Sequence, residues 1–134
     1  MENLVIKGSD KTPHFNMQPN GNISFGGVSM PEDAADFYFR IIDWISDYYR
    51  NPSTKTDITV SFKYLNSSSS SMIFKIFHCL NNLHITGKTR VKCYWYYEKS
   101  DEMMKNYIER VMTYAEDIDF KVYPTDNILD AQAS

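Results

Sequence analysis

The chain has 134 residues, 43% of them hydrophobic, and a formal net charge of −3 at pH 7. A chain of this length and apolar content is expected to fold around a buried core, which excludes intrinsic disorder. Because Lys and Arg form no long run, the composition argues against binding to a nucleic-acid backbone as the main role. No apolar run reaches the ~20 residues of a membrane span and no signal-peptide pattern opens the chain, so we expect a cytoplasmic protein without membrane insertion.

The N-terminal region is expected to contribute two strands. Leu4–Ile6 is a short apolar run that is typical of an edge strand, whereas residues 8–20 hold two prolines and are predicted to be irregular or extended. Alternation of apolar and polar residues at positions 22–25 predicts a second strand, which ends at the two glycines that follow.

A long amphipathic helix is predicted next. Ser29 is a candidate N-cap, and Pro31 and Glu32 suit the first helical turn. Apolar residues recur at helical spacing over residues 34–48, with acidic residues on the opposite side. The helix is expected to stop at residues 51–52, where a proline follows an asparagine.

The rest of the chain alternates between strands and helices. The predicted elements are a strand at residues 58–64, a helix from the serines at 67–71 to just before Gly87, a strand at 91–97, a helix that starts at residues 100–102 with Ser100 as its capping hydroxyl, and a short strand at 120–122.

The order β-β-α-β-α-β-α-β predicts an α/β fold with a single domain over residues 1–124 and a polar tail at residues 125–134. The strands alternate apolar and polar residues, whereas strands covered on both faces are usually apolar throughout. We therefore expect a mixed sheet of about five strands with three helices mainly on one face. The predicted open face carries Ser24, Thr59, Ser61, Lys63, Lys92, Tyr94, Tyr96, Lys121 and Tyr123.

Five consecutive serines at positions 67–71 stand between a predicted strand and a predicted helix. The first N–H groups of a helix lack internal partners and the helix dipole is positive there, so a phosphate on one of these hydroxyls would be stabilised. The alternative is that Asn66 or Ser67 only caps the helix and that the other hydroxyls are solvated. Local physics leaves both interpretations open.

Patterns of catalytic or metal-binding chemistry are incomplete. The Gly-Lys-Thr sequence at residues 87–89 lacks the upstream glycine of a P-loop and precedes a strand instead of following one. His14, His78 and His84 do not have the spacing of a zinc site, so no metal is expected. The serines lack the flanking glycines of a hydrolase nucleophile elbow, which argues against an enzyme of that class.

The two cysteines and the tyrosines of one predicted strand each have their own interpretation. Cys79 and Cys93 lie among apolar residues without metal or redox spacing, so we interpret them as reduced core thiols. Tyr94 and Tyr96, with Lys92 nearby, suggest an RNA-binding sheet face as a minor alternative. The strand lacks the motif of RNA-recognition sheets, and exposed tyrosines are equally typical of protein interfaces.

Four segments carry a family resemblance: residues 12–13 (Thr-Pro), residues 29–33 with the helix through residues 43–44, residues 64–69 (Tyr-Leu-Asn-Ser-Ser-Ser) and residues 94–98. With these segments and its element order, the chain resembles the SiaC-like regulatory phosphoproteins, a family of small bacterial domains. The segment at 64–69 is the most specific. The family is similar to anti-sigma-factor antagonists in regulatory logic and roughly in fold, which implies a STAS-like architecture.

The resemblance implies a non-enzymatic regulator without a cofactor. A cognate protein kinase phosphorylates a hydroxyl at a helix start, and a PP2C-type phosphatase reverses this. In the best-known system the unphosphorylated protein binds and promotes a diguanylate cyclase, so such a cyclase is the expected partner. An alternative is a partner switch that acts on a sigma-factor regulator.

The resemblance also implies the site residues. The phosphorylated position of the family, usually a threonine, falls on Ser67, with Ser68 and Ser69 as the alternatives. The expected turn and partner-contact residues are Tyr64, Asn66, Ser68, Ser71, Phe74 and His78.

Overall fold

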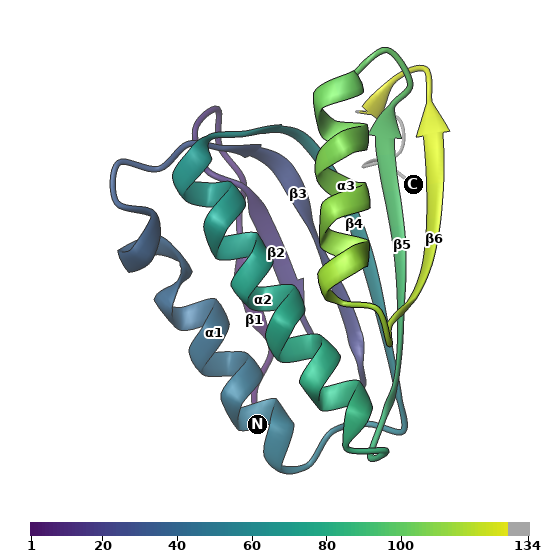
Figure 1. Ribbon diagram of the computed structural model, residues 1–134. Coiled ribbons are helices and arrows are strands. Elements are labelled where there is room, and N and C mark those ends of the chain that lie inside the picture. The colour runs from purple at the N-terminus through teal and green to yellow at the C-terminus, as the bar shows by residue number, and fades with distance from the viewer. Residues whose placement is uncertain (129–134) are drawn as a thin grey trace.

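Six strands and three helices make up residues 1–128, the part of the chain that this computed structural model describes (Figure 1). In chain order they are β1 (Leu4–Ile6), β2 (His14–Met17), β3 (Asn22–Ser29), α1 (Ala34–Arg50), β4 (Lys55–Leu65), α2 (Ser67–Ile85), β5 (Arg90–Glu98), α3 (Glu102–Tyr114) and β6 (Asp119–Thr125). The strands form one sheet in the order β1-β2-β3-β4-β5-β6. Strands β1 to β3 pair antiparallel, and β3 to β6 pair parallel.

All three helices lie on one face of this sheet, as Figure 1 shows. The predicted mixed α/β class and the one-sided placement of the helices are therefore confirmed. Each parallel pair of strands is joined through one of the helices, because a parallel connection must cross back over the sheet.

Strand β2 is an element that the sequence does not predict, so the sheet has six strands and not about five. It lies within residues 8–20, for which the sequence predicts irregular or extended backbone but no separate strand. Phe15 and Met17 are each 1% exposed, while His14 and Asn16, which alternate with them, point to the other face. Four residues give too short an alternation to identify a strand, and pairing with β1 and β3 stabilises it.

Helix α1 begins later than the sequence predicts. Its N-cap is Asp33, whose carboxylate accepts a hydrogen bond from the Asp36 amide at 3.1 Å. The expected cap, Ser29, is instead the buried last residue of β3. Helix α3 is likewise capped by Asp101 and not by Ser100. Hydroxyls and carboxylates are both good caps, so the path of the backbone into each helix decides which one is used.

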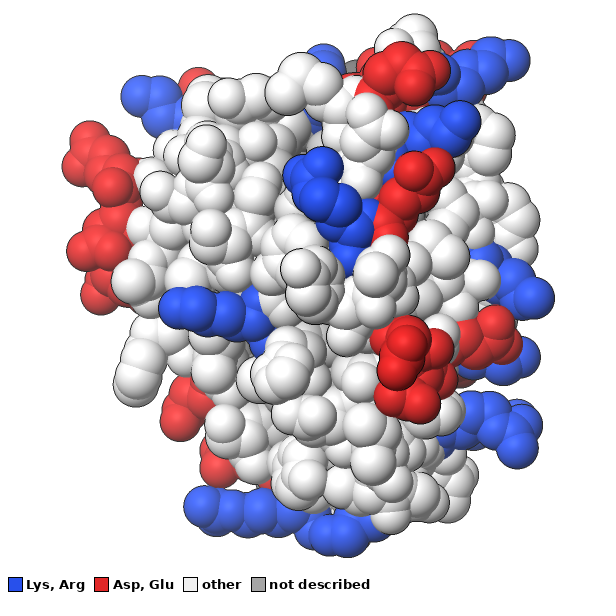
Figure 2. Space-filling view, in the orientation of Figure 1, with Lys and Arg blue, Asp and Glu red and all other residues white. Residues whose placement is uncertain are grey.

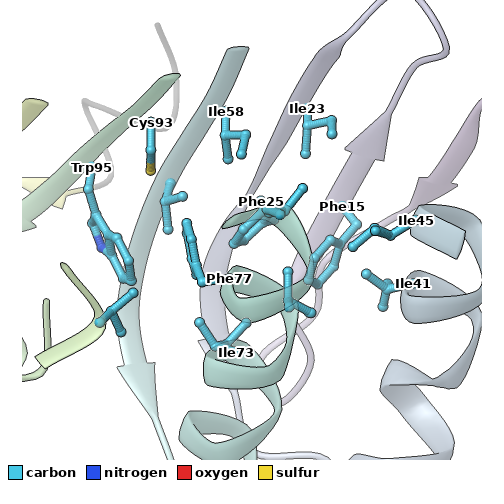
Figure 3. Packing of buried hydrophobic residues seen from close by; sticks show 14 of the residues in the cluster. Phe15, Ile23, Phe25, Ile41, Ile45, Ile58, Ile73, Phe77, Cys93 and Trp95 are labelled. Carbon is cyan, nitrogen blue, oxygen red and sulfur yellow. The ribbon is translucent and has the colours of Figure 1, made fainter. Parts of the chain in front are cut away.

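The core fills the space between the sheet and the helices (Figure 3). Phe15 on β2 stacks on Phe25 on β3 with ring centroids 4.8 Å apart. Phe77 of α2 stacks on Trp95 of β5 at 5.2 Å, so this helix is fixed over the middle of the sheet. Such aromatic pairs add to the stabilisation that comes from burial of apolar area.

Both cysteines are free thiols, as the sequence predicts. Cys93 is fully buried in the core and Cys79 is half-buried. Burial raises the pKa of both thiols, which disfavours the reactive thiolate.

The open face of the sheet is largely as expected. The residues predicted there are exposed or half-buried, except Ser61, which is 5% exposed, so that expectation is wrong. Ser61 is the register partner of Gly26 on β3, and a Cβ atom at Gly26 would collide with the Ser61 carbonyl oxygen. The close approach of the two backbones shields Ser61 from solvent.

The described residues end shortly after strand β6. Strand β6 continues to Thr125, and Ile128 is fully buried. Residues 129–134, most of the expected polar tail, lie outside the described residues.

Candidate regulatory site at the start of helix α2

A single asparagine organises the turn from β4 into α2. The Asn66 side-chain oxygen accepts a hydrogen bond from the Ser69 amide at 2.9 Å, which is the usual geometry of an N-cap. The Asn66 amide donates to the carbonyl oxygen of Ser29 at 3.0 Å. The start of α2 is therefore anchored to the end of β3, and Ser67, Ser68 and Ser69 become its first three helical residues.

The five serines separate into two groups because successive helical residues rotate by about 100°. Ser67 and Ser68 are exposed, and within residues 1–128 neither hydroxyl makes a hydrogen bond. Ser69 is fully buried. The hydroxyls of Ser70 and Ser71 donate to backbone carbonyl oxygens one turn earlier, at 3.0 and 3.3 Å. Only the first two serines present unengaged hydroxyls beside free helix N–H groups.

A buried chain of hydroxyl groups lies beneath this turn. The Ser29 hydroxyl donates to the Ser69 hydroxyl at 2.7 Å and lies 2.7 Å from the Tyr38 hydroxyl of α1. Burial raises the pKa of Tyr38 to about 12, although hydrogen bonds to the two serines oppose that shift. This chain of hydroxyl groups joins β3, α1 and α2 at one point. Sequence reasoning missed it because a serine at a strand end and a tyrosine on an apolar helix face look like a cap and a core residue.

A depression of about 160 Å³ opens beside the first turn of α2. Its floor includes Tyr107 of α3, whose hydroxyl donates to the Ser70 carbonyl oxygen at 2.7 Å. Tyr64 and Met103 are 50% and 84% exposed at this depression. Lys63 and Arg110 add two cations to its lining, and Asp101 adds one carboxylate. Exposed apolar side chains around a hollow are typical of a surface that binds another protein.

The remaining predicted contact residues lie further along α2. Phe74 is half-buried and packs edge-on against Tyr107 and Tyr114, with ring centroids 5.3 and 5.7 Å apart, so it joins α2 to α3. His78 is exposed and lies 3.3 Å from the amide of Asn82 on the same helix. These two side chains therefore do not converge on the turn at Asn66.

The described residues do not form a metal centre. Residues 1–128 contain no group of three or more His, Cys, Asp or Glu side chains that could hold a metal ion. His84 accepts a hydrogen bond from the Val91 amide at 3.0 Å and so has a structural role. No described helix is both long enough and apolar enough to cross a membrane.

Comparison with known proteins identifies the family of this chain. Residues 6–125 match the family described as SiaC family regulatory phosphoprotein. An uncharacterised protein of Pseudomonas aeruginosa strain UCBPP-PA14 is 26% identical over 110 residues, which cover 81% of this chain and 86% of that protein.

Solved structures share the fold. The crystal structure of apo-SiaC from Pseudomonas aeruginosa has a TM-score of 0.78 and 24% identity, over 92% of this chain and 99% of that chain. A chain in the crystal structure of the diguanylate cyclase SiaD in complex with its activator SiaC, from the same organism, has the same TM-score at 25% identity, over 91% and 99%. Because the family match spans most of the sequence and the fold agrees throughout, this protein belongs to the SiaC family of regulatory phosphoproteins.

Proposed function

We propose that this protein is a non-enzymatic cytoplasmic regulator that binds and activates a diguanylate cyclase, and that phosphorylation of Ser67 ends this binding. The observation that carries the proposal is the exposed, unengaged hydroxyl of Ser67 on the first residue of α2. The complex of SiaD with its activator SiaC supports the choice of a cyclase as partner. The cytoplasm is where a kinase and a cyclase both find their nucleotide substrates.

The geometry favours Ser67 and Ser68 over the other serines as substrates of the kinase. A kinase must reach the hydroxyl, and Ser69 is fully buried within the hydroxyl chain. Ser70 and Ser71 already donate to backbone carbonyl oxygens. Between the two exposed serines, the family resemblance implies Ser67.

Phosphorylation at this point changes the surface without unfolding the domain. A phosphate adds about −1.5 to −2 charges at neutral pH. The free N–H groups and the positive end of the α2 dipole stabilise that charge within the monomer. A partner that packs apolar side chains around Tyr64 and Met103 would have to desolvate the same charge, so its affinity falls. A PP2C-type phosphatase restores the binding surface.

Substitution of Ser67 tests the switch. Ser67→Asp places a carboxylate at the helix start, and we expect it to weaken binding to a diguanylate cyclase from the same genome by about tenfold or more. Ser67→Ala is expected to bind like the parent protein. Calorimetry measures the affinity, and production of the cyclic dinucleotide measures activation.

Ser46→Asp is the control because it adds the same charge at an exposed serine of α1, and it is expected to bind like the parent protein. Circular dichroism confirms that each variant is folded. If Ser67→Asp bound and activated the cyclase like the parent protein, the switch at this residue would be refuted. Phosphopeptide mass spectrometry after treatment with the cognate kinase gives a second check: the phosphate is expected on Ser67 and is expected to be absent from Ser67→Ala.

A further inference from the structure

Four cations gather at the end of the sheet that lies opposite Ser67. Lys55 opens β4 and Arg90 opens β5, and the two are register partners on these adjacent parallel strands. Lys92 follows on β5, and Lys88 precedes this strand. We call these four residues the basic edge. Figure 2 shows Lys and Arg side chains along the lower border of the molecule, where α1 and α2 end.

The fold itself gives no reason for this clustering. Like charges at paired positions of neighbouring strands repel each other. Within residues 1–128, no carboxylate lies within 4.0 Å of the charged groups of Lys55, Lys88 or Arg90, and only Lys92 has an acidic partner, Asp119 at 3.8 Å. The chain as a whole is acidic, with a net charge of −3, so the local excess of positive charge does not follow from composition.

The C-terminal dipole of α2 accounts for only part of the cluster. A cation beside the last turn of a helix is favourable, and this suits Lys88, which also lies 6.0 Å from the centre of the Tyr49 ring. Lys55 and Arg90 stand on strands, whose net dipoles are small. These two side chains therefore require another explanation.

Two depressions meet at Lys55 and Arg90. One has a volume of about 500 Å³, and its lining includes Lys88 and no carboxylate. The other, about 190 Å³, lies towards the open face of the sheet and adds Lys92, Asp57 and Tyr94. Strong positive charge thus borders a hollow on both sides of the Lys55–Arg90 pair.

A third depression of about 280 Å³ continues from the second through Asp57 and Tyr94. Asn16, Ser24 and Thr59 make its lining polar. The side-chain oxygen of Asn16 is buried and has no hydrogen-bond partner within the described residues. From Lys88 to Asn16 the lining therefore changes from cationic, without a carboxylate, to aromatic and polar with one carboxylate, Asp57.

We propose that the basic edge and the adjoining sheet face bind a nucleoside diphosphate or triphosphate. The phosphate groups lie between Lys55 and Arg90, where the guanidinium binds phosphate oxygens in bidentate fashion and the ammonium supplies a point charge. The base stacks on Tyr94, and its polar edge faces the depression that includes Asn16. Lys55 and Leu65 are the two ends of β4, so about 30 Å separates this site from the turn before Ser67.

Calorimetry on the purified protein tests the assignment with GTP, ATP, GMP and pyrophosphate as probes. We expect GTP and ATP to bind more tightly than GMP, because a single phosphate cannot engage both cations. The double variant Lys55→Ala/Arg90→Ala is expected to lose about tenfold or more in affinity for the triphosphates. The control Lys11→Ala/Lys105→Ala removes the same net charge from exposed positions elsewhere and is expected to bind like the parent protein.

Tyr94→Leu separates nucleotide binding from simple anion binding. This variant is expected to bind GTP and ATP more weakly than the parent protein and to bind pyrophosphate with unchanged affinity. The proposal is wrong if the triphosphates fail to bind at millimolar concentration or bind equally well to both double variants. It is also wrong if pyrophosphate binds as tightly as GTP, or if a single-stranded RNA oligonucleotide binds more tightly than either triphosphate. The cyclase is absent from these measurements, so they stand independently of the proposed switch at Ser67.

Discussion

Ser67 and Ser69 are two residues apart and have opposite surroundings. Asn66 fixes where the first helical turn of α2 begins, and the helical rotation then directs the Ser67 side chain to solvent and the Ser69 side chain into the domain. Ser69 meets Ser29 there, and Ser29 meets Tyr38. The cap and the exposed hydroxyl are therefore different residues: Asn66 caps the helix, and Ser67 is left exposed.

The raised pKa of Tyr38 predicts how stability changes at high pH. The group keeps its proton up to about pH 12 in the folded state, against an ordinary value of 10.0 in the unfolded chain. Its contribution to the unfolding free energy is therefore fully present below pH 10 and is lost as the pH rises through about 12. Two units of pKa correspond to about 2 to 3 kcal/mol of unfolding free energy.

Tyr38→Phe has no proton to lose, so we expect its unfolding free energy to decline less steeply above pH 10 than that of the parent protein. Urea denaturation across this alkaline range measures the difference between the two proteins. If the unfolding free energies of the two proteins declined equally with pH, the pKa of Tyr38 would not be raised in the folded state. The variant is also expected to be less stable at neutral pH by about 1 kcal/mol, because Ser29 loses one of its hydrogen-bond partners.

At the scale of elements, the contact between β3 and β4 controls the geometry of the site. These strands are parallel neighbours, and β3 ends at Ser29 while β4 leads directly to Asn66. The Asn66 amide donates to the Ser29 carbonyl oxygen, so a shift of one strand along the other would separate the cap from its anchor. Gly26 makes the close approach of the strands possible, since it has no side chain.

Gly26→Ala is expected to destabilise the domain by about 2 to 3 kcal/mol, because the added methyl group meets the Ser61 carbonyl oxygen of β4. Thermal unfolding measures this loss. Ser24→Ala, on the same strand and at the open face, is the control and is expected to change stability by less than about 0.5 kcal/mol. Equal melting temperatures for the two variants would contradict the close packing of β3 against β4.

For the whole molecule, the one-sided α/β arrangement places the two proposed sites, the start of α2 and the basic edge, at opposite ends of the sheet. The parallel strands β4 and β5 run from the basic edge towards the start of α2 and the start of α3. The core lies on the helix side, so substitutions on the open face alter the surface and leave the packing intact. Among residues 1–128, the edge strands β1 and β6 each pair with one neighbour.

This arrangement predicts the order of local stability. Amide hydrogens in the middle of β4 and β5 are expected to exchange most slowly, because these strands are paired on both sides and covered by α2. Amides of β1 are expected to exchange fastest among the strands, because it has three residues and one neighbour. Hydrogen exchange followed by NMR measures both. Protection of β1 equal to that of β4 would contradict this order.

Local sequence pattern was sufficient for the elements that are long and strongly periodic. Residues 58–64 and 91–97 alternate strictly and lie within β4 and β5, and the alternation also predicts the helix-free face. The turn at Asn66 could be predicted from the sequence for the same reason, because a strand, a cap and a helix follow each other within a few residues. The family resemblance then narrowed the serine run to Ser67.

Other features depend on residues that are distant in the chain, and only the tertiary structure decided them. Strand β2 exists because β1 and β3 supply its hydrogen-bond partners, and Ser29 is a buried hydrogen-bonding residue because Tyr38 and Ser69 meet it there. The Lys55–Arg90 pair likewise appears only when β4 and β5 are brought into register. Sequence by itself determined the periodic elements and the exposed turn, since their physics is local. Packing decided which hydroxyls are buried and which charges lie together, because those contacts join segments that the chain keeps far apart.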